Sequence, residues 1–214
     1  MTTPRHGKPY VWVTWLTGLL AGEDSCVYAP WFKAHYKFDK VDRGFDLAMW
    51  KAQHAEMVNA RRAELEAQGW TCTVEDQNSF KLTGETAILA GKADLVGTRG
   101  PDMVVSDEKG GKHRDSDFWQ VVIYLVALPK VWKQLTGLRW YGEVVYRDGP
   151  LAVHQAQANG EAAAKIFTLM RVVGSDAPPA KVPSARECAF CDIPKSDCPE
   201  RIEVETEPVL VSEF

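Results

Sequence analysis

The sequence lacks a long apolar run. Its two longest apolar stretches, residues 11–21 and 118–128, have eleven residues each, well short of the roughly 20 that span a bilayer. The first follows Arg5 and Lys8 as the core of a signal peptide would, but two threonines and two tryptophans interrupt it and no A-x-A site follows. We therefore expect no transmembrane helix, no membrane partner and a cytoplasmic protein.

Cysteine is scarce, and repeats and low-complexity tracts are absent. Five cysteines in 214 residues are an odd number for a disulfide framework, and a chain of this length can bury a core without one. With 45% hydrophobic and 25% charged residues, the composition excludes collagen, a coiled coil and wholesale disorder. One soluble globular domain is expected.

Positive charge is not in excess. The net charge is -4, which gives the whole molecule no attraction for nucleic acid. From Glu200 onward the chain has five glutamates and one arginine, so residues 1–199 sum to zero. The acidity belongs to a tail at 200–214, and the net charge does not exclude a basic site in the domain at 1–199.

Glycine, proline and polar clusters divide the domain into elements. Residues 10–40 form an aromatic-rich arm of short helices, and residues 42–68 form a long helix that ends at Gly69. Five prolines and three cysteines exclude regular structure from residues 174–199. Strands are predicted at 80–82, 86–96, 102–109 and, as a hairpin, 138–146 and 151–153; helices are predicted at 118–128, ended by Pro129, and at 160–173. This order predicts an α/β fold with one mixed sheet flanked by helices.

Charged residues occur where apolar strands end. Asp94 has apolar neighbours on both sides, and the strand at 103–105 runs into Ser106 and then Asp107, Glu108 and Lys109. Because strand side chains alternate, Asp107 and Lys109 point to one face. Two carboxylates can bind a divalent cation, and a lysine beside them can stabilise developing negative charge, as in phosphodiester hydrolysis. The alternative is a polar strand end entering a solvated glycine turn.

Two further features join this motif. Gln120 and Tyr124 share one face of the next helix, and His54 lies within the long helix upstream. A helical histidine, an acidic residue, a strand-end D-x-K and a helical Q-x-x-x-Y, in this order, resemble the RecB-type branch of the PD-(D/E)xK nuclease superfamily.

The resemblance implies a restriction-endonuclease-like core at residues 42–173 and a role for each motif residue. It implies that Mg2+ or Mn2+ binds His54, Asp94, Asp107 and the backbone carbonyl of Glu108. It also implies that Lys109 orients or activates the attacking water and that Gln120 and Tyr124 position water or DNA. Asp107 stands where many relatives carry glutamate, so the Glu108 side chain can share its role.

Three cysteines, Cys188, Cys191 and Cys198, form a C-x2-C-x6-C pattern followed by Pro199. Cys26 and Cys72 are the candidates for a fourth ligand, and Cys72 lies in an alternating strand-like segment where a free cysteine is commonly a core residue. A distant N-terminal cysteine joined to this pattern resembles the iron-sulfur staple of one group of RecB-type nucleases, which includes CRISPR-associated exonucleases of the adaptation module and helicase-nuclease subunits. It implies a structural 4Fe-4S cluster on Cys26, Cys188, Cys191 and Cys198, with residues 174–199 as the cluster-binding segment. A four-thiolate zinc site is the less favoured alternative.

Basic residues lie near these motifs. Lys112 and Arg114 follow Lys109, and Arg61 lies two turns along from His54, so we expect all three to contact DNA. Aromatic rings of the arm either stack on bases or form core. The family suggests an exonuclease acting on single-stranded ends, either alone or in a DNA repair, recombination or CRISPR adaptation complex. The rival hypothesis is a catalytically silent DNA-binding or assembly subunit.

Overall fold

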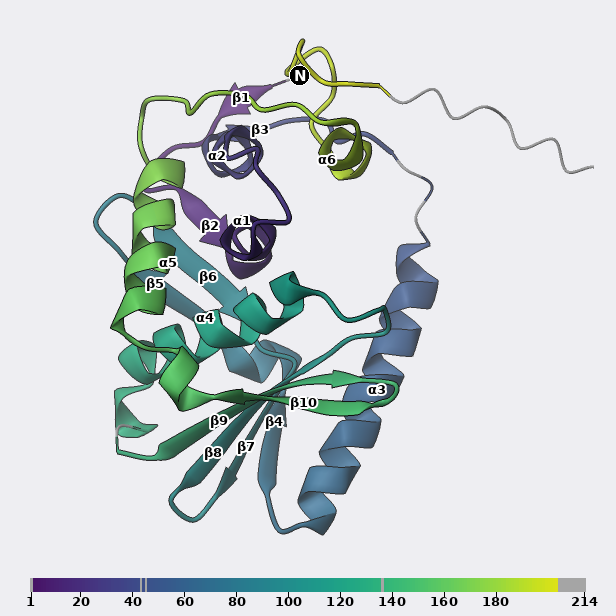
Figure 1. Cartoon of the computed structure of the whole chain (residues 1–214), viewed down its shortest axis with the longest axis vertical. Helices are drawn as coiled ribbons and strands as arrows, with labels where there is room; N and C mark the ends of the chain where they lie inside the picture. The colour runs from purple at the N-terminus through teal and green to yellow at the C-terminus, as the bar shows by residue number, and fades with distance from the viewer. Residues whose placement is uncertain (1, 43, 45, 136, 204–214) are drawn as a thin grey trace, which may run out of the picture.

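The computed structural model describes residues 2–42, 44, 46–135 and 137–203 of the chain (Figure 1). Residues 204–214, most of the acidic tail predicted at 200–214, lie outside the described residues. The fold is a mixed α/β arrangement, as the order of elements predicted. No helix in the described ranges is long and apolar enough to cross a membrane.

The strands form three sheets instead of the single predicted sheet. Five of them make the largest sheet, in the order β10-β9-β8-β7-β4, three make a second sheet, β2-β6-β5, and β1 pairs with β3. Among the strand pairs of the described residues, only β8–β9 and β2–β6 are parallel. The bounds are β1 Thr3–Pro4, β2 Tyr10–Trp12, β3 Tyr36–Lys37, β4 Thr71–Val74, β5 Ser79–Thr83, β6 Ile88–Lys92, β7 Leu95–Arg99, β8 Asp102–Glu108, β9 Arg139–Tyr146 and β10 Gly149–His154.

Six α-helices in the described part of the chain pack with these sheets. The helix at α5 has the predicted bounds, and Asn159 caps it by accepting a hydrogen bond from the amide of Ala162 at 3.0 Å. The bounds are α1 Thr17–Ala21, α2 Tyr28–His35, α3 Leu47–Ala67, α4 Asp115–Val131, α5 Gly160–Val173 and α6 Ala185–Phe190, with 3-10 turns at Val13–Trp15, Glu75–Asn78, Lys133–Leu135 and Gln155–Gln157.

The segment predicted as one strand at 86–96 is two strands in different sheets. β6 ends at Lys92 and β7 begins at Leu95, so Ala93 and Asp94 lie at the passage from the three-stranded to the five-stranded sheet. Apolar residues on both sides gave the segment a continuous strand pattern, because each half is buried in its own sheet. The break places the Asp94 carboxylate where the two sheets meet.

Helix α4 forms the centre of the core. Every residue from Gln120 to Leu128 is buried, and the helix packs against α1, β5, β8 and β9. A helix that is apolar all round belongs inside the protein. The prediction that Pro129 ends this helix is wrong: Pro129 lies within its last turn, and the helix continues to Val131. A proline near a helix end removes only one of the backbone hydrogen bonds.

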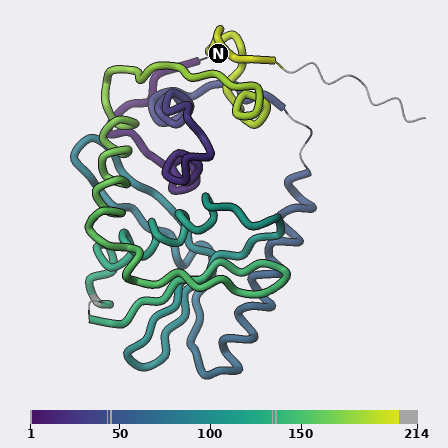
Figure 2. The backbone as a smooth tube through the Cα atoms, viewed as in Figure 1, coloured from purple at the N-terminus to yellow at the C-terminus, as the bar shows by residue number. Residues whose placement is uncertain are grey.

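The two ends of the described chain meet on one side of the molecule, where Figures 1 and 2 show the N-terminal and C-terminal segments side by side. The Thr2 hydroxyl donates to Asp197 Oδ1 at 2.7 Å, and the Trp31 indole donates to the carbonyl of Ser175 at 2.8 Å. Residues 174–199 are irregular as predicted except for α6, which contains Cys188 and is preceded by the N-cap residue Ser184. The N-terminal arm and the C-terminal segment therefore pack as one unit.

Candidate active site

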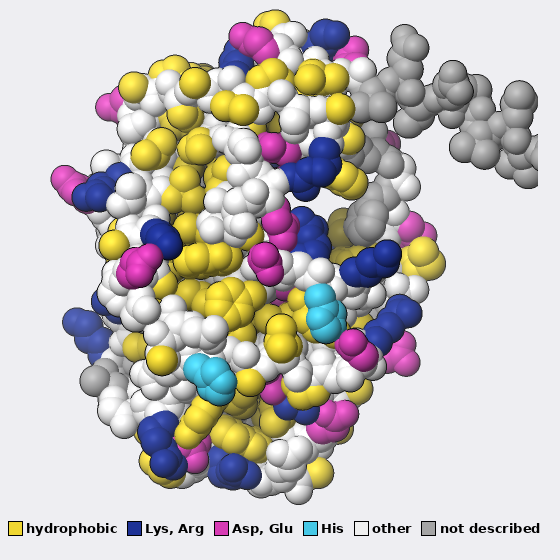
Figure 3. Space-filling model, in the orientation of Figure 1, with side chains coloured by type: hydrophobic (Ala, Val, Ile, Leu, Met, Phe, Trp, Pro, Cys, Tyr) yellow, Lys and Arg dark blue, Asp and Glu magenta, His cyan; other side chains and the backbone are white. Residues whose placement is uncertain are grey.

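A cleft of about 650 Å³ lies between the arm, α3 and the ends of β6 and β8. Figure 3 shows a hollow between the upper and lower parts of the molecule, on the right of the view, with basic and acidic side chains around it. Six residues predicted from the sequence motifs line this one cleft: His54, Asp94, Glu108, Lys109, Gln120 and Tyr124. The predicted motifs, which span 71 positions of the chain from His54 to Tyr124, thus come together in space.

Asp94 connects α3 to the end of β8. Its Oδ1 lies 3.3 Å from His54 Nε2, and its Oδ2 accepts a hydrogen bond from the backbone amide of Glu108 at 3.1 Å. The hydrogen bond that His54 donates to Asp94 raises the pKa of His54 and outweighs the opposing effect of burial. The histidine and the aspartate are therefore held as a pair at the wall of the cleft.

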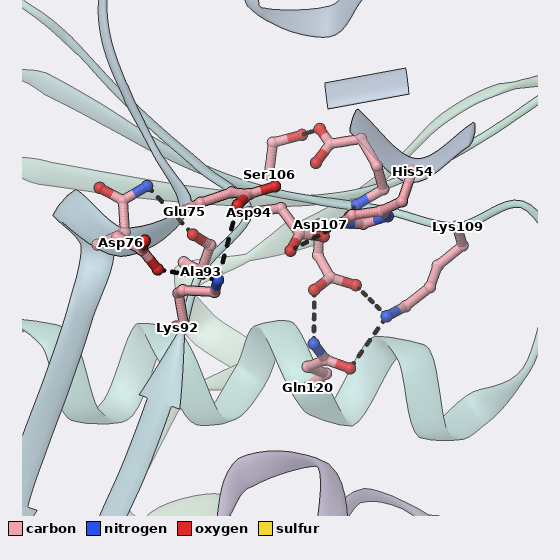
Figure 4. Close-up of polar contacts among 12 residues, drawn as sticks. His54, Glu75, Asp76, Lys92, Ala93, Asp94, Ser106, Asp107, Lys109 and Gln120 are labelled. Atoms are coloured by element: carbon pink, nitrogen blue, oxygen red, sulfur yellow. Dashed lines mark hydrogen bonds and ion pairs between the residues drawn. The ribbon is translucent and has the colours of Figure 1, made fainter. Parts of the chain in front are cut away.

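Asp107, Lys109 and Gln120 form a closed triangle of polar contacts (Figure 4). Lys109 Nζ lies 2.7 Å from Asp107 Oδ2 and donates to Gln120 Oε1 at 3.1 Å, while Gln120 Nε2 donates to Asp107 Oδ1 at 2.6 Å. Burial acts to lower the pKa of Lys109, but the adjacent Asp107 carboxylate outweighs it and raises that pKa. The lysine is therefore a fixed cation, and its position is set by both partners.

Tyr124 extends this network toward β6. Its hydroxyl accepts a hydrogen bond from Gln120 Nε2 at 3.1 Å and donates to the carbonyl of Lys92 at 2.9 Å. Burial raises the pKa of Tyr124 well above its usual value, so the hydroxyl stays protonated. The Q-x-x-x-Y spacing thus connects Asp107 in one sheet with the backbone of the other.

The two neighbouring carboxylates, Asp107 and Glu108, have different surroundings. Asp107 is fully buried and is not among the residues that line the cleft, whereas Glu108 does line it. Glu108 Oε1 accepts from the Ser106 hydroxyl at 2.7 Å, and Oε2 is buried with no hydrogen-bond partner among the described residues. Burial raises the pKa of Glu108 to about 8. An unsatisfied buried carboxylate oxygen is costly unless a cation or a proton binds it.

The donors at this site suit a hard divalent cation. His54, Asp94 and Glu108 offer nitrogen and carboxylate oxygen, which Mg2+ and Mn2+ accept. Among the described residues, however, no three histidine, cysteine, aspartate or glutamate side chains already converge on one point. The His54–Asp94 contact occupies donor atoms that an ion would use, so binding requires these side chains to separate. Donor chemistry and the unsatisfied Glu108 oxygen fit the cation.

Basic side chains line the same cleft, although residues 1–199 carry no net charge. Lys112 and Arg114 lie there as predicted, together with Lys92 and Arg147, which the motifs did not indicate. Arg147 is part of the β9–β10 turn, and only the pairing of those strands brings it to the cleft. Five cations including Lys109 therefore face a space that also holds carboxylates.

Arg61, for which a DNA contact is predicted, pairs with two carboxylates. Its guanidinium donates to both oxygens of Glu143 at 2.8 and 2.7 Å and to Glu64 at 2.7 Å, and it is not among the residues lining the cleft. A bidentate pair of this kind fixes α3 on β9. The DNA contact expected of Arg61 gains no support from its position.

The cysteines predicted as cluster ligands line a second cavity of about 600 Å³. Cys26 reaches it from the loop before α2, Cys188 from α6, and Cys191 and Cys198 from the chain that follows. Burial raises the pKa of Cys191 and Cys198, so these thiols stay protonated unless a metal binds them. Cys72 packs elsewhere, against Leu65, Leu95 and Val104, as expected for a core residue.

The two cavities are adjacent. Thr14, Arg114 and Asp117 line both of them. Glu23, three residues before Cys26, accepts hydrogen bonds from Arg114 Nη2 at 2.7 Å and from the backbone amide of Ser116 at 3.0 Å. The loop that carries Cys26 therefore also holds the beginning of α4, a connection that no pattern in the sequence indicated.

Comparisons with known proteins give limited information. No protein-family model and no curated protein matches the chain. Among solved structures, it is similar to one titled "Crystal structure of SSO0001", with a TM-score of 0.49 and 13% sequence identity over 93% of this chain and 90% of that one.

Proposed function

We propose that the protein is a metal-dependent DNA nuclease with a PD-(D/E)xK-type, restriction-endonuclease-like core, and that it hydrolyses phosphodiester bonds at single-stranded ends. One observation carries the proposal: six residues of the motif set, from four separate segments, line one cleft together with four further basic residues. A polar strand end in a solvated turn would not account for that convergence.

The site contains the parts that phosphodiester hydrolysis needs. Attack of water on phosphorus breaks the bond to one sugar oxygen, which takes up a proton as it leaves. Lys109, held by Asp107 and Gln120, can donate hydrogen bonds to the attacking water and to the phosphate oxygen that gains negative charge. His54, Asp94 and Glu108, with Asp107 behind them, would hold Mg2+ or Mn2+, which acts as a Lewis acid on the phosphate.

The basic residues support a polyanionic substrate. Lys112 and Arg147 are exposed at the cleft, and neither has a carboxylate partner within the described part of the chain. Cations placed in this way can neutralise successive phosphates, which is the main source of affinity for nucleic acid. Because the net charge of the domain is near zero, this attraction is local to the cleft.

The cysteine cavity supports the second part of the proposal, a structural 4Fe-4S cluster on Cys26, Cys188, Cys191 and Cys198. Cysteines from both ends of the chain line one cavity, next to the aromatic residues Tyr28, Trp31 and Phe32. Anaerobically purified protein is expected to be brown, and Cys191→Ser to be colourless. Colourless wild-type protein with one equivalent of zinc would favour the zinc site.

A nuclease assay tests the enzymatic proposal. Purified protein is incubated with Mn2+ and single-stranded DNA labelled at one end, in parallel with Lys109→Ala and Asp94→Ala. Wild-type protein should shorten the DNA, and each variant should lose at least about 100-fold in rate, the usual effect of removing one electrostatic catalytic group. The order of products also gives the polarity and separates exonuclease from endonuclease action.

A matched control is Lys165→Ala, which removes a lysine that pairs with Glu161 on α5, away from the cleft. It should cut at the wild-type rate. If folded, metal-loaded wild-type protein leaves DNA intact, or if Lys109→Ala cuts as fast as the control, the nuclease proposal fails. Binding without cleavage would instead indicate the silent DNA-binding subunit.

A further inference from the structure

Two large aromatic side chains are exposed inside the cleft. Trp12, at the end of β2, is 47% exposed and Trp50, in the second turn of α3, is 48% exposed, and both line the cleft that holds Asp94 and Lys109. Three other aromatic residues of the arm, Tyr28, Trp31 and Phe32, are buried. Of the exposed aromatic residues, Trp12 and Trp50 are the ones that lie beside the proposed catalytic residues.

The local structure keeps each ring at the cleft. Trp12 points outward because its neighbours Val11 and Val13 are buried, as strand alternation requires. The Trp50 ring lies parallel to the His54 ring, with 5.0 Å between centroids and 7° between planes, and His54 is in turn held by Asp94. Two aromatic side chains, one on the arm and one on α3, are therefore oriented by residues of the core and of the site.

Exposed aromatics near cations are the means by which proteins bind unpaired nucleic acid strands. Every base has a flat face that can stack on an indole ring, while Lys112 and Arg147 are available for the phosphates. In a duplex the base faces are already stacked on one another and are out of reach. An apolar protein partner would not require the cations that surround these rings.

We infer that Trp12 and Trp50 are base-stacking residues that make the cleft prefer an unpaired DNA strand to a duplex. The inference rests on the proposed nuclease function and adds the residues that determine the form of the substrate. Stacking next to the carboxylates would also splay the bases and expose the backbone between them to Lys109. The two tryptophans are then specificity-determining residues, distinct from the groups that act on the phosphate.

Fluorescence anisotropy with Ca2+ in place of Mg2+ tests this by equilibrium binding. The probes are a labelled oligothymidine of about 12 nucleotides, a strand of the same length made of abasic sites, and a duplex. Wild-type protein should bind oligothymidine about tenfold or more tightly than the abasic strand. Trp12→Ala and Trp50→Ala should each weaken oligothymidine binding by roughly tenfold, while Trp12→Phe should keep most of it.

The control is Tyr141→Ala, which removes an aromatic ring on β9 that is 44% exposed and does not line the cleft; it should leave all three affinities unchanged. Equal binding of the oligothymidine and abasic strands by wild-type protein overturns the stacking role without relying on any variant. Tryptophan variants that bind oligothymidine as tightly as wild-type protein would also overturn the stacking role. Failure of wild-type protein to bind any of the probes would instead count against the nuclease proposal itself.

Discussion

At the scale of single residues, Asp107 and Glu108 show how neighbours in sequence acquire different roles. Alternation along β8 turns Asp107 to Lys109 and Gln120, and Glu108 to Ser106. Asp107 Oδ1 accepts a hydrogen bond from Gln120 and Oδ2 forms an ion pair with Lys109, whereas Glu108 Oε2 has neither a hydrogen bond nor an ion pair among the described residues. Glu108 therefore has more capacity to bind a cation than the motif alone implies.

This difference predicts the effect of Glu108→Gln on metal binding. The amide keeps the size of the side chain and removes its negative charge, so the affinity for Mn2+ should fall by about tenfold or more. Isothermal titration with Mn2+ measures it. Ser106→Ala is the matched control, because it removes the hydrogen bond to Glu108 and keeps the carboxylate. Wild-type affinity in Glu108→Gln would leave the backbone carbonyl as the only contribution of this residue.

Gln120 predicts an effect on stability. Its side-chain amide contacts Asp107, Lys109 and Tyr124 at once. Gln120→Ala would leave the buried Asp107 Oδ1 without its donor, and we expect a loss of about 1 to 3 kcal/mol in the free energy of unfolding. Urea denaturation followed by circular dichroism measures this loss. Gln157→Ala, at an exposed 3-10 turn, should change stability far less, and an equal loss in both would contradict the buried network.

At the scale of elements, the loop before α2 holds the beginning of α4. Glu23 accepts from Ser116 and Arg114 at the end of the helix where backbone amides lack partners and a negative charge is favourable. The following residues, Ser25 and Cys26, donate their amides to Glu187 at 3.1 and 3.0 Å. One short loop thus connects α6, which carries Cys188, with the helix that carries Gln120.

The Glu23 contacts predict a pH-dependent contribution to stability. Burial opposes ionisation, but the bonds from Ser116 and Arg114 lower the pKa of Glu23 below 4.5. A carboxyl group whose pKa is lower in the folded than in the unfolded state adds stability at pH values above its unfolded-state pKa. That stability is lost as the pH falls through the folded-state pKa. Glu23→Gln should therefore be less stable than wild type by about 1 kcal/mol at pH 7 and nearly equal to it at an acidic pH below the folded-state pKa of Glu23. Urea titrations at both pH values measure the gap, and a gap that is constant with pH would contradict it.

The elements also show what the sequence could and could not predict. The hairpin, α5 and the convergence of His54, Asp94 and Lys109 followed from periodicity and from motif order. The break at Ala93 and Asp94 did not, because burial on two different sheets produces the same apolar pattern as one strand. Arg147 and Glu23 were missed because only tertiary pairing brings them to their partners. The pairing of Arg61 with Glu143 could not be predicted either, because that carboxylate lies 82 positions away.

At the scale of the whole molecule, the chain forms two regions with the cleft between them. One contains the five-stranded sheet with α3, and the other contains the arm, α6 and the irregular C-terminal segment. Trp12 and Trp50 come from opposite sides of this division. The second region has a small hydrophobic cluster of its own, built on Tyr28, Trp31, Phe32 and Ile193, so a metal bound by its cysteines would supply much of its order.

This arrangement predicts which cysteine would complete the proposed cluster and which part of the protein would depend on it. Cys26→Ser should lose the bound metal and make residues 174–199 sensitive to protease, because the remaining cysteines no longer connect that segment to the arm. Cys72→Ser is the matched control, since Cys72 packs against Leu65 and Leu95 beneath α3; it should keep the metal and resist cleavage. Metal analysis and limited proteolysis with mass spectrometry measure both effects. If Cys72→Ser loses the metal and Cys26→Ser retains it, the cavity at the chain ends is not the metal site, and the two ends are held together by packing and hydrogen bonds alone.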